Sequence, residues 1–190
     1  QVMNTLQPGL CVLGTRLPGC FNVFEMSVRA VLGQQITVKA ASTLAARLVA
    51  VYGTQVQTGI EGLTHSFPAP AAILALGENI SEHLGKLGII SARANTIYQL
   101  ARVLADEKND FGFCGNPEEE MQKLQAIRGI GSWTAQYIAM RAMGWPDAFL
   151  PTDAGIKKAL PDHTPKELQV LSEAWRPWRS YATVNLWNTL

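Results

Sequence analysis

Apolar residues along this chain recur three or four positions apart, which is the spacing of an α-helix with one buried face. Phe24 and Val28 follow this spacing after Asn22, which forms the pattern of a capping box with Glu25. A second apolar stripe stops at Gly53, where we expect the left-handed residue that ends many helices. Strict alternation of apolar and polar residues is nearly absent, so the pattern predicts helices almost throughout.

The rest of the chain carries further helix boundaries. Prolines and glycines divide residues 54–90 into short helical pieces, and the polar run at 106–115 predicts a loop. Asn116 and Thr164, each followed by a proline, mark the starts of two later helices. About nine or ten helices result, and we expect an all-α, two-lobed helical globule that forms one domain over residues 1–190.

Composition narrows the class of protein. Of the 190 residues, 47% are hydrophobic and 16% are charged, which favours a folded core over disorder. No stretch of about 18 apolar residues occurs, so we expect a soluble protein with no membrane partner. A net charge of +1 excludes a polycationic binder, whereas the basic residues of the last third would suit a polyanionic partner.

The cysteines, the histidines and the N-terminus add three further expectations. Cys11, Cys20 and Cys114 are odd in number and lack Cys-x-x-Cys spacing, so they build neither a disulfide framework nor a four-cysteine metal site. The three histidines share no ligand spacing, which argues against a catalytic metal. The chain begins with Gln1 rather than methionine, which predicts a segment taken from a longer polypeptide.

The most specific stretch is LQAIRGIGSWTA at residues 124–135, which predicts a helix, a tight glycine turn and a second helix. Gly129 and Gly131 permit backbone angles that other residues resist. The amides at the start of the second helix can hold a phosphate, with Ser132 as the expected cap and Thr134 adding a hydroxyl. For a Gly-x-Gly pair alone, an ordinary connection between helices is the alternative interpretation.

Four motifs in order resemble the helix-hairpin-helix DNA glycosylase superfamily over about residues 17–190, and the glycine hairpin, expected at about 117–144, is one of them. Leu-Pro-Thr-Asp, ending at Asp153, resembles the loop of the superfamily's catalytic aspartate, although local sequence alone makes this residue an ordinary N-cap. The segment VRAVLGQQIT resembles the helix and loop that enter the DNA. WRPWRSYA, with Trp187 beyond it, is similar to bacterial 3-methyladenine DNA glycosylase II.

The resemblance implies a role for each matched position. Asp153 becomes the catalytic carboxylate, and Trp175 and Trp178 are left to packing. The altered base is assigned to three aromatic side chains, Trp133, Tyr137 and Trp187. DNA contacts are assigned to six residues, Gln34, Gln35, Gly129, Gly131, Ser132 and Thr134. No cofactor is required, but a Na⁺ or K⁺ is implied on the backbone carbonyls of Gln125, Ile127 and Gly129.

The implied activity is base excision repair. Trp133 stands where the superfamily's lyases carry a Schiff-base lysine, which implies a monofunctional enzyme that uses water. Its partner would be double-stranded DNA containing alkylated bases such as 3-methyladenine, which are flipped out and released by hydrolysis of the N-glycosidic bond. The alternative is a non-catalytic helix-hairpin-helix DNA-binding module. A lyase acting on oxidised bases is disfavoured by Trp133 and by the lack of a cysteine cluster.

Two departures from the resembled family concern the surroundings of the site. That family carries an N-terminal β-rich domain for which this chain has no room. Gln35 occupies the position of the family's apolar wedge, the residue that fills the gap left by a flipped base. We expect a monomer located in the cytoplasm, and associated with the nucleoid if the source is bacterial.

Overall fold

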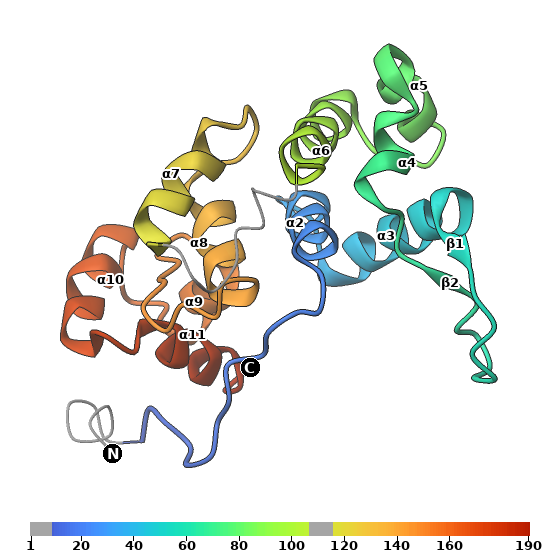
Figure 1. Ribbon diagram of the computed structural model, residues 1–190. Coiled ribbons are helices and arrows are strands. Elements are labelled where there is room, and N and C mark those ends of the chain that lie inside the picture. The colour runs from blue at the N-terminus through green and yellow to red at the C-terminus, as the bar shows by residue number, and fades with distance from the viewer. Residues whose placement is uncertain (1–8, 107–115) are drawn as a thin grey trace. The chain divides into compact units, whose positions relative to one another are not determined.

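The computed structural model describes residues 9–106 and 116–190. The chain divides into two compact units (Figure 1). Unit 1 comprises Gln1–Phe21, Gly112–Gln122 and Gly131–Leu190, and unit 2 comprises Asn22–Phe111 and Lys123–Ile130. The described residues form ten α-helices, two 3-10 helices and one two-stranded sheet, which confirms the prediction of an all-α fold. The loop predicted at 106–115 falls almost wholly outside the described residues.

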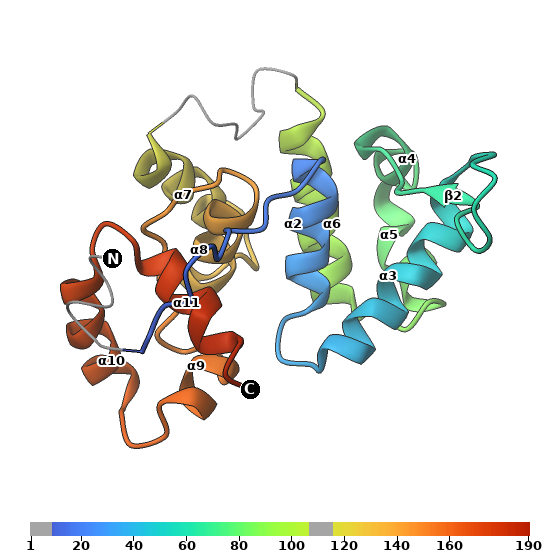
Figure 2. The same cartoon turned by 90° about the horizontal axis from the view of Figure 1, so that it is seen from below.

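Unit 2 is built around one central helix. Its helices are α2 (Val23–Leu32), α3 (Val38–Tyr52), α4 (Pro70–Leu74), η1 (Gly77–Asn79), α5 (Ile80–Gly85) and α6 (Ser91–Leu104), and β1 (Thr54–Gln55) pairs antiparallel with β2 (His65–Ser66). Helix α6 packs against α2, α4 and α5, and α2 lies beside α6 in both views (Figures 1 and 2). The apolar faces predicted from the sequence are buried there, since Val28, Ile97 and Leu100 are fully enclosed.

Two predicted helix ends in unit 2 differ from the structure. Asn22 caps α2 by accepting a hydrogen bond from the Glu25 amide at 2.8 Å, but the Glu25 carboxylate pairs with Arg29, so the capping box is only half formed. Gly53 has a φ of −71°, and the predicted left-handed terminator is therefore wrong. A Cβ at Gly53 would lie 2.4 Å from the backbone oxygens of Val49 and Ser66, so close passage of the chain is what requires glycine.

Unit 1 contains the remaining helices. They are α7 (Pro117–Ala126), which continues into unit 2, and α8 (Ser132–Arg141), α9 (Ala154–Ala159), α10 (Pro165–Ser172), η2 (Glu173–Trp175) and α11 (Arg179–Trp187). Asn116 and Thr164 cap α7 and α10, as predicted, and Thr164 also forms a complete capping box with Glu167. Trp178 was expected to be packed, but its exposed fraction is 41%, whereas Trp175 is 1% exposed.

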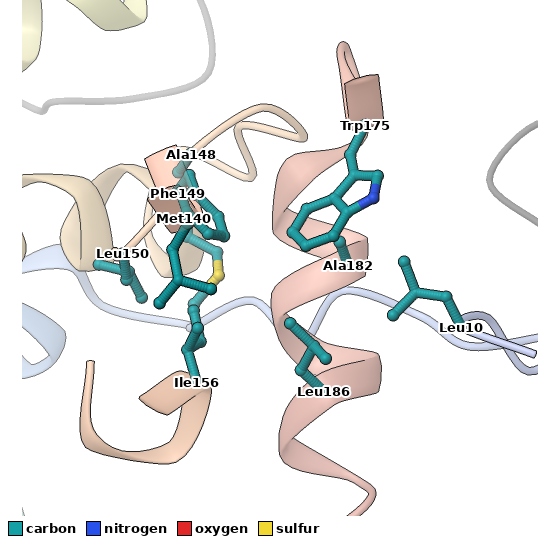
Figure 3. Close-up of a cluster of buried hydrophobic side chains, with 10 residues drawn as sticks. Leu10, Met140, Ala148, Phe149, Leu150, Ile156, Trp175, Ala182 and Leu186 are labelled. Atoms are coloured by element: carbon teal, nitrogen blue, oxygen red, sulfur yellow. The ribbon is translucent and has the colours of Figure 1, made fainter. Parts of the chain in front are cut away.

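The core of unit 1 joins α8, α9, α10 and α11 (Figure 3). Met140, Ile156, Trp175 and Leu186 meet there with the segment that carries Phe149. No helix among the described residues is both long enough and apolar enough to cross a membrane.

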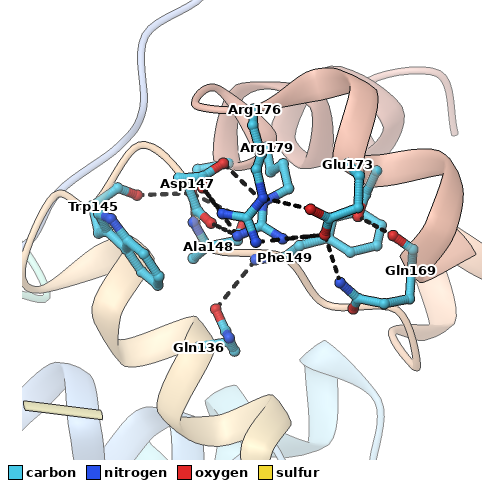
Figure 4. A network of polar contacts seen from close by, with 11 residues as sticks. Gln136, Trp145, Asp147, Ala148, Phe149, Gln169, Glu173, Arg176 and Arg179 are labelled. Carbon is cyan, nitrogen blue, oxygen red and sulfur yellow. Dashed lines mark hydrogen bonds and ion pairs between the residues drawn. The ribbon is translucent and has the colours of Figure 1, made fainter. Parts of the chain in front are cut away.

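A buried ion pair fixes the segment that leads to Asp153 (Figure 4). Arg179, at the start of α11, donates from Nε to Asp147 Oδ1 at 2.8 Å and from Nη2 to Oδ2 at 3.0 Å. Arg176 contacts the same carboxylate, and its hydrogen bond to Glu173 lowers the pKa of the Glu173 carboxyl. The Phe149 amide also donates to Gln136 of α8 at 3.2 Å. Helices α8 and α11 therefore both hold this segment.

We expect Arg179→Met to lower the free energy of unfolding by about 3–5 kcal/mol, because it leaves the Asp147 carboxylate buried without its main partner. Urea denaturation followed by circular dichroism measures the change. Lys86→Met is the control, because it removes only an exposed pair with Glu82, and it should leave the unfolding midpoint unchanged. Equal midpoints for Arg179→Met and the parent would contradict a stabilising role for the buried pair.

Candidate active site

Asp153 is the N-cap of α9, as its local sequence predicts. Its Oδ1 accepts hydrogen bonds from the backbone amides of Gly155 at 2.9 Å and of Ile156 at 3.1 Å. A carboxylate at this end of a helix also faces the positive end of the helix dipole. The backbone therefore holds one side of the carboxylate in place.

Two indole groups hold the same carboxylate. Trp187 of α11 donates from Nε1 to Asp153 Oδ1 at 2.8 Å, and Trp133 of α8 donates from Nε1 to Oδ2 at 3.2 Å. We call these two N–H groups the indole clamp. The three residues were predicted as site residues, and the structure brings them together. Their mutual hydrogen bonds were not predicted, because they join positions 20 and 34 residues apart that share no local sequence signal.

An aromatic column lies along α8 beside the clamp. The rings of Trp133 and Tyr137 are stacked, with centroids 5.1 Å apart and planes 8° from parallel. The Arg141 guanidinium lies 5.7 Å from the centroid of Tyr137. Because residues four apart follow one another along a helix face, Trp133 and Arg141 lie on opposite sides of Tyr137. Trp133 therefore covers one face of Tyr137, and the stacking of a base on this ring stays a prediction.

The first part of the predicted hairpin belongs to unit 2. Gly129 has a φ of +97°, a conformation that favours glycine, and a Cβ there would lie 2.0 Å from Thr96 Oγ1. The Thr96 hydroxyl donates to the Arg128 carbonyl at 3.0 Å. This turn is therefore built on α6, and Thr96 is a supporting residue that sequence reasoning missed.

The second part of the hairpin belongs to unit 1 and differs from the prediction at three positions. Gly131 has φ −89° and ψ 178°, angles open to any residue, and no atom lies within 4 Å of a Cβ built there. Gly131 is itself the N-cap of α8, so Ser132 is the first helical residue and not the predicted cap. Thr134 is only 3% exposed, and the expectation that its hydroxyl meets a phosphate is wrong. No side chain caps α8, so its first amides face outward from an exposed start.

The loop between α2 and α3 carries the other predicted DNA contacts. Gln34 donates from Nε2 to the Gly129 carbonyl at 3.0 Å, and Arg93 donates to the backbone oxygen of Gln34. Gln35 is exposed and has a φ of 54°, a left-handed conformation that costs about 1–2 kcal/mol for a residue other than glycine. Gln34 and Arg93 therefore secure the loop, and Gln35 stands at its exposed tip.

Two of the three predicted ion ligands at the hairpin have hydrogen-bond partners. The Ile127 carbonyl accepts from the Ile130 amide at 3.0 Å, and the Gly129 carbonyl accepts from Gln34 at 3.0 Å. Each carbonyl oxygen retains a second lone pair, so the donor set is compatible with a monovalent cation. Among the described residues, no group of three or more His, Cys, Asp or Glu side chains could hold a metal ion.

The all-helical fold, the glycine turn and a carboxylate held at a helix start between two indoles define a class, the helix-hairpin-helix proteins of base excision DNA repair. Residues 28–179 match the model of the HhH-GPD superfamily base excision DNA repair proteins, and the chain belongs to this family.

Two curated relatives and one solved structure extend the comparison. DNA-3-methyladenine glycosylase 2 of Escherichia coli is 38% identical over 93% of this chain and 61% of its own length. The probable bifunctional transcriptional activator/DNA repair enzyme AlkA of Mycobacterium tuberculosis is 42% identical over 93% of this chain and 35% of its own length. The structure of 3-methyladenine DNA-glycosylase from Archaeoglobus fulgidus gives a TM-score of 0.76 at 26% identity, covering 90% of this chain and 58% of that chain. The chain therefore spans less than two thirds of the length of each of these relatives.

The two hairpin glycines should respond differently to alanine. We expect Gly129→Ala to lower the free energy of unfolding by about 2 kcal/mol or more, because the positive φ and the Thr96 hydroxyl both oppose a side chain. Gly131→Ala should change it by less than about 0.5 kcal/mol, because its backbone and surroundings accept a methyl group. Chemical denaturation of both variants measures the difference, and equal unfolding midpoints would contradict it.

Proposed function

We propose that this chain is the catalytic part of a monofunctional DNA glycosylase that removes alkylated bases, such as 3-methyladenine, from double-stranded DNA. The observation that carries the proposal is the Asp153 carboxylate at the start of α9, with four N–H donors around it. The names of the Escherichia coli relative and of the Archaeoglobus fulgidus structure support the class of substrate. The N-glycosidic bond would be hydrolysed once the altered nucleotide has been flipped out of the duplex.

The chemistry needs a fixed negative charge beside the sugar. As the bond between the sugar carbon and the base breaks, the base leaves with the electron pair and positive charge develops on the sugar. The Asp153 carboxylate would stabilise that charge and orient the attacking water, whose oxygen bonds to the sugar carbon and whose proton passes to the carboxylate or to solvent. A cationic alkylated base leaves as a neutral molecule, so its departure needs no protonation.

The proposal of a monofunctional enzyme rests on Trp133. By resemblance this position carries the Schiff-base lysine of lyases, and here an indole N–H donates to Asp153 instead. Cation–π attraction of roughly 0.5–2 kcal/mol for each ring would favour a cationic base against Trp133 and Trp187. Tyr137, with one face stacked on Trp133, would extend the aromatic column beside the base.

DNA contact is assigned to exposed parts of each unit. In unit 1 the first amides of α8, at Ser132 after Gly131, would bind a phosphate. In unit 2 Gln35 would enter the duplex, and Gln34 would act indirectly by holding the loop. A Na⁺ or K⁺ on the hairpin carbonyls of unit 2 would add positive charge for contact with a phosphate of the DNA. We further propose a cytoplasmic monomer that forms part of a longer polypeptide, which the greater length of the relatives supports.

Replacement of Asp153 tests the catalytic assignment. We expect Asp153→Asn to slow base release from methylated DNA by at least about 100-fold, because it removes the charge on which the reaction depends. Since the Asn amide would face the Trp133 N–H donor, we also expect a lower melting temperature in a variant that still folds. Single-turnover release of 3-methyladenine and thermal melting measure the two effects.

Asp162→Asn is the control for this experiment, because Asp162 is an exposed acid that follows α9, and it should release bases at the parent rate. If Asp153→Asn also retains the parent rate, Asp153 serves only as a helix cap. If the parent chain itself releases no base from methylated DNA, the chain is instead a non-catalytic DNA-binding module.

Substitution of Gly131 tests the phosphate site. We expect Gly131→Val to weaken binding to duplex DNA containing an abasic-site analogue by about tenfold or more, because the side chain would occupy the space before the α8 amides. Fluorescence anisotropy measures the affinity, which should also fall as salt rises. Gly85→Val, at an open position on α5, is the control and should bind as the parent does. Parent-like affinity in a folded Gly131→Val variant would rule out the hairpin contact.

A further inference from the structure

We infer that Gly155 and the indole clamp form a positioning device for Asp153, in which the missing side chain of Gly155 allows the Trp187 N–H to reach the carboxylate. This inference rests on the proposed function, since it concerns how the catalytic carboxylate is held. It gives Trp187 and Trp133 a role in the reaction that is separate from stacking on a base. It also makes Gly155 a residue on which the rate depends, although its side chain is only a hydrogen atom.

The contacts of Gly155 explain why glycine occurs at this position. A Cβ there would lie 2.7 Å from Cδ1 and 2.9 Å from Nε1 of Trp187, and 3.1 Å from Asp153 Oδ1. Its φ lies outside the left-handed range, so the backbone itself does not require glycine. Glycine inside a helix is less favourable than alanine by about 1 kcal/mol. The approach of the Trp187 indole is therefore the structural reason for Gly155.

The hydrogen bonds make the two carboxylate oxygens different. Oδ1 receives three donors, from the amides of Gly155 and Ile156 and from Trp187, and its lone pairs are fully used. Oδ2 receives one donor, from Trp133, and keeps acceptor capacity. The donors on both oxygens fix the plane of the carboxylate. Because Oδ2 alone keeps acceptor capacity, it is the oxygen that would face the sugar carbon or a water molecule.

The indoles themselves are held by the core of unit 1. Trp187 follows the buried Leu186 at the end of α11, and the buried Arg179 fixes the start of that helix. Trp133 precedes the buried Thr134 and Ala135 on α8. The donors are thus fixed before any substrate binds, which is the condition for electrostatic preorganisation.

Nuclear magnetic resonance tests the clamp without any reaction. The five tryptophans give five indole ¹H–¹⁵N signals. In Asp153→Ala we expect the signals of Trp133 and Trp187 to move upfield and their protons to exchange faster, because each loses a charged acceptor. The signals of the other three tryptophans should keep their positions. If the Trp133 and Trp187 signals also stay in place, the clamp does not exist in solution and the inference is wrong.

Kinetics test whether the clamp serves the reaction. Trp187→Phe retains an aromatic ring but removes the N–H, whereas Gly155→Ala retains the indole and displaces it. We expect each variant to slow single-turnover base release by about tenfold or more, since each loses one hydrogen bond to a charged group, while the affinity for DNA stays at the parent value. For Gly155→Ala, which retains the indole, the factor should be equal for 3-methyladenine and the neutral base hypoxanthine. Trp187→Ala should impair 3-methyladenine release further, because it also removes the ring face.

Gly85→Ala is the control for adding a methyl group to a helix, and it should retain the parent rate. The inference is overturned if Trp187→Phe and Gly155→Ala release bases at the parent rate, or if they lose only DNA affinity. The proposed function fails by a different result, an unchanged rate in Asp153→Asn. If Asp153→Asn is slow but Trp187→Phe and Gly155→Ala release bases at the parent rate, the proposed glycosylase function stands and the positioning role of the indole clamp is refuted.

Discussion

One partly buried carboxylate sets the requirements that the rest of unit 1 meets. Removing Asp153 from bulk water is unfavourable unless hydrogen bonds replace its hydration, and four N–H groups do so. Two come from the first turn of α9, one from α8 and one from α11. The core around Met140 and Ile156 and the ion pair of Arg179 with Asp147 keep these three helices together. The contacts that stabilise this unit therefore also fix the geometry of its carboxylate.

The two tryptophans combine two properties of the indole group. The N–H edge donates to the carboxylate, and an open ring face is an electron-rich surface that attracts cations. One face of Trp133 and one face of Tyr137 are already used in their mutual stacking. An aromatic residue in such a site therefore cannot be assigned a stacking role from its type alone.

Unit 2 is organised by a different constraint, the support of a strained exposed loop. The left-handed Gln35 lies next to Gln34, whose side chain and backbone oxygen are bound to Gly129 and Arg93. Thr96 also holds the turn at Gly129 against α6. Strain at an exposed residue persists only where its surroundings fix the backbone, and these contacts fix it here.

Local patterns in the sequence determined the helical class and several helix starts. The caps at Asn116, Asp153 and Thr164 depend on atoms two or three residues apart, so their residue types reveal them. Resemblance to the superfamily brought Trp133 and Trp187 into the site, but not their N–H bonds to Asp153. Tertiary structure alone decided those bonds and the reasons for Gly53 and Gly155, as well as the ordinary backbone of Gly131. Each of these results except the Gly131 backbone depends on an approach between segments distant along the chain, and neither periodicity nor residue type encodes the distance between such segments.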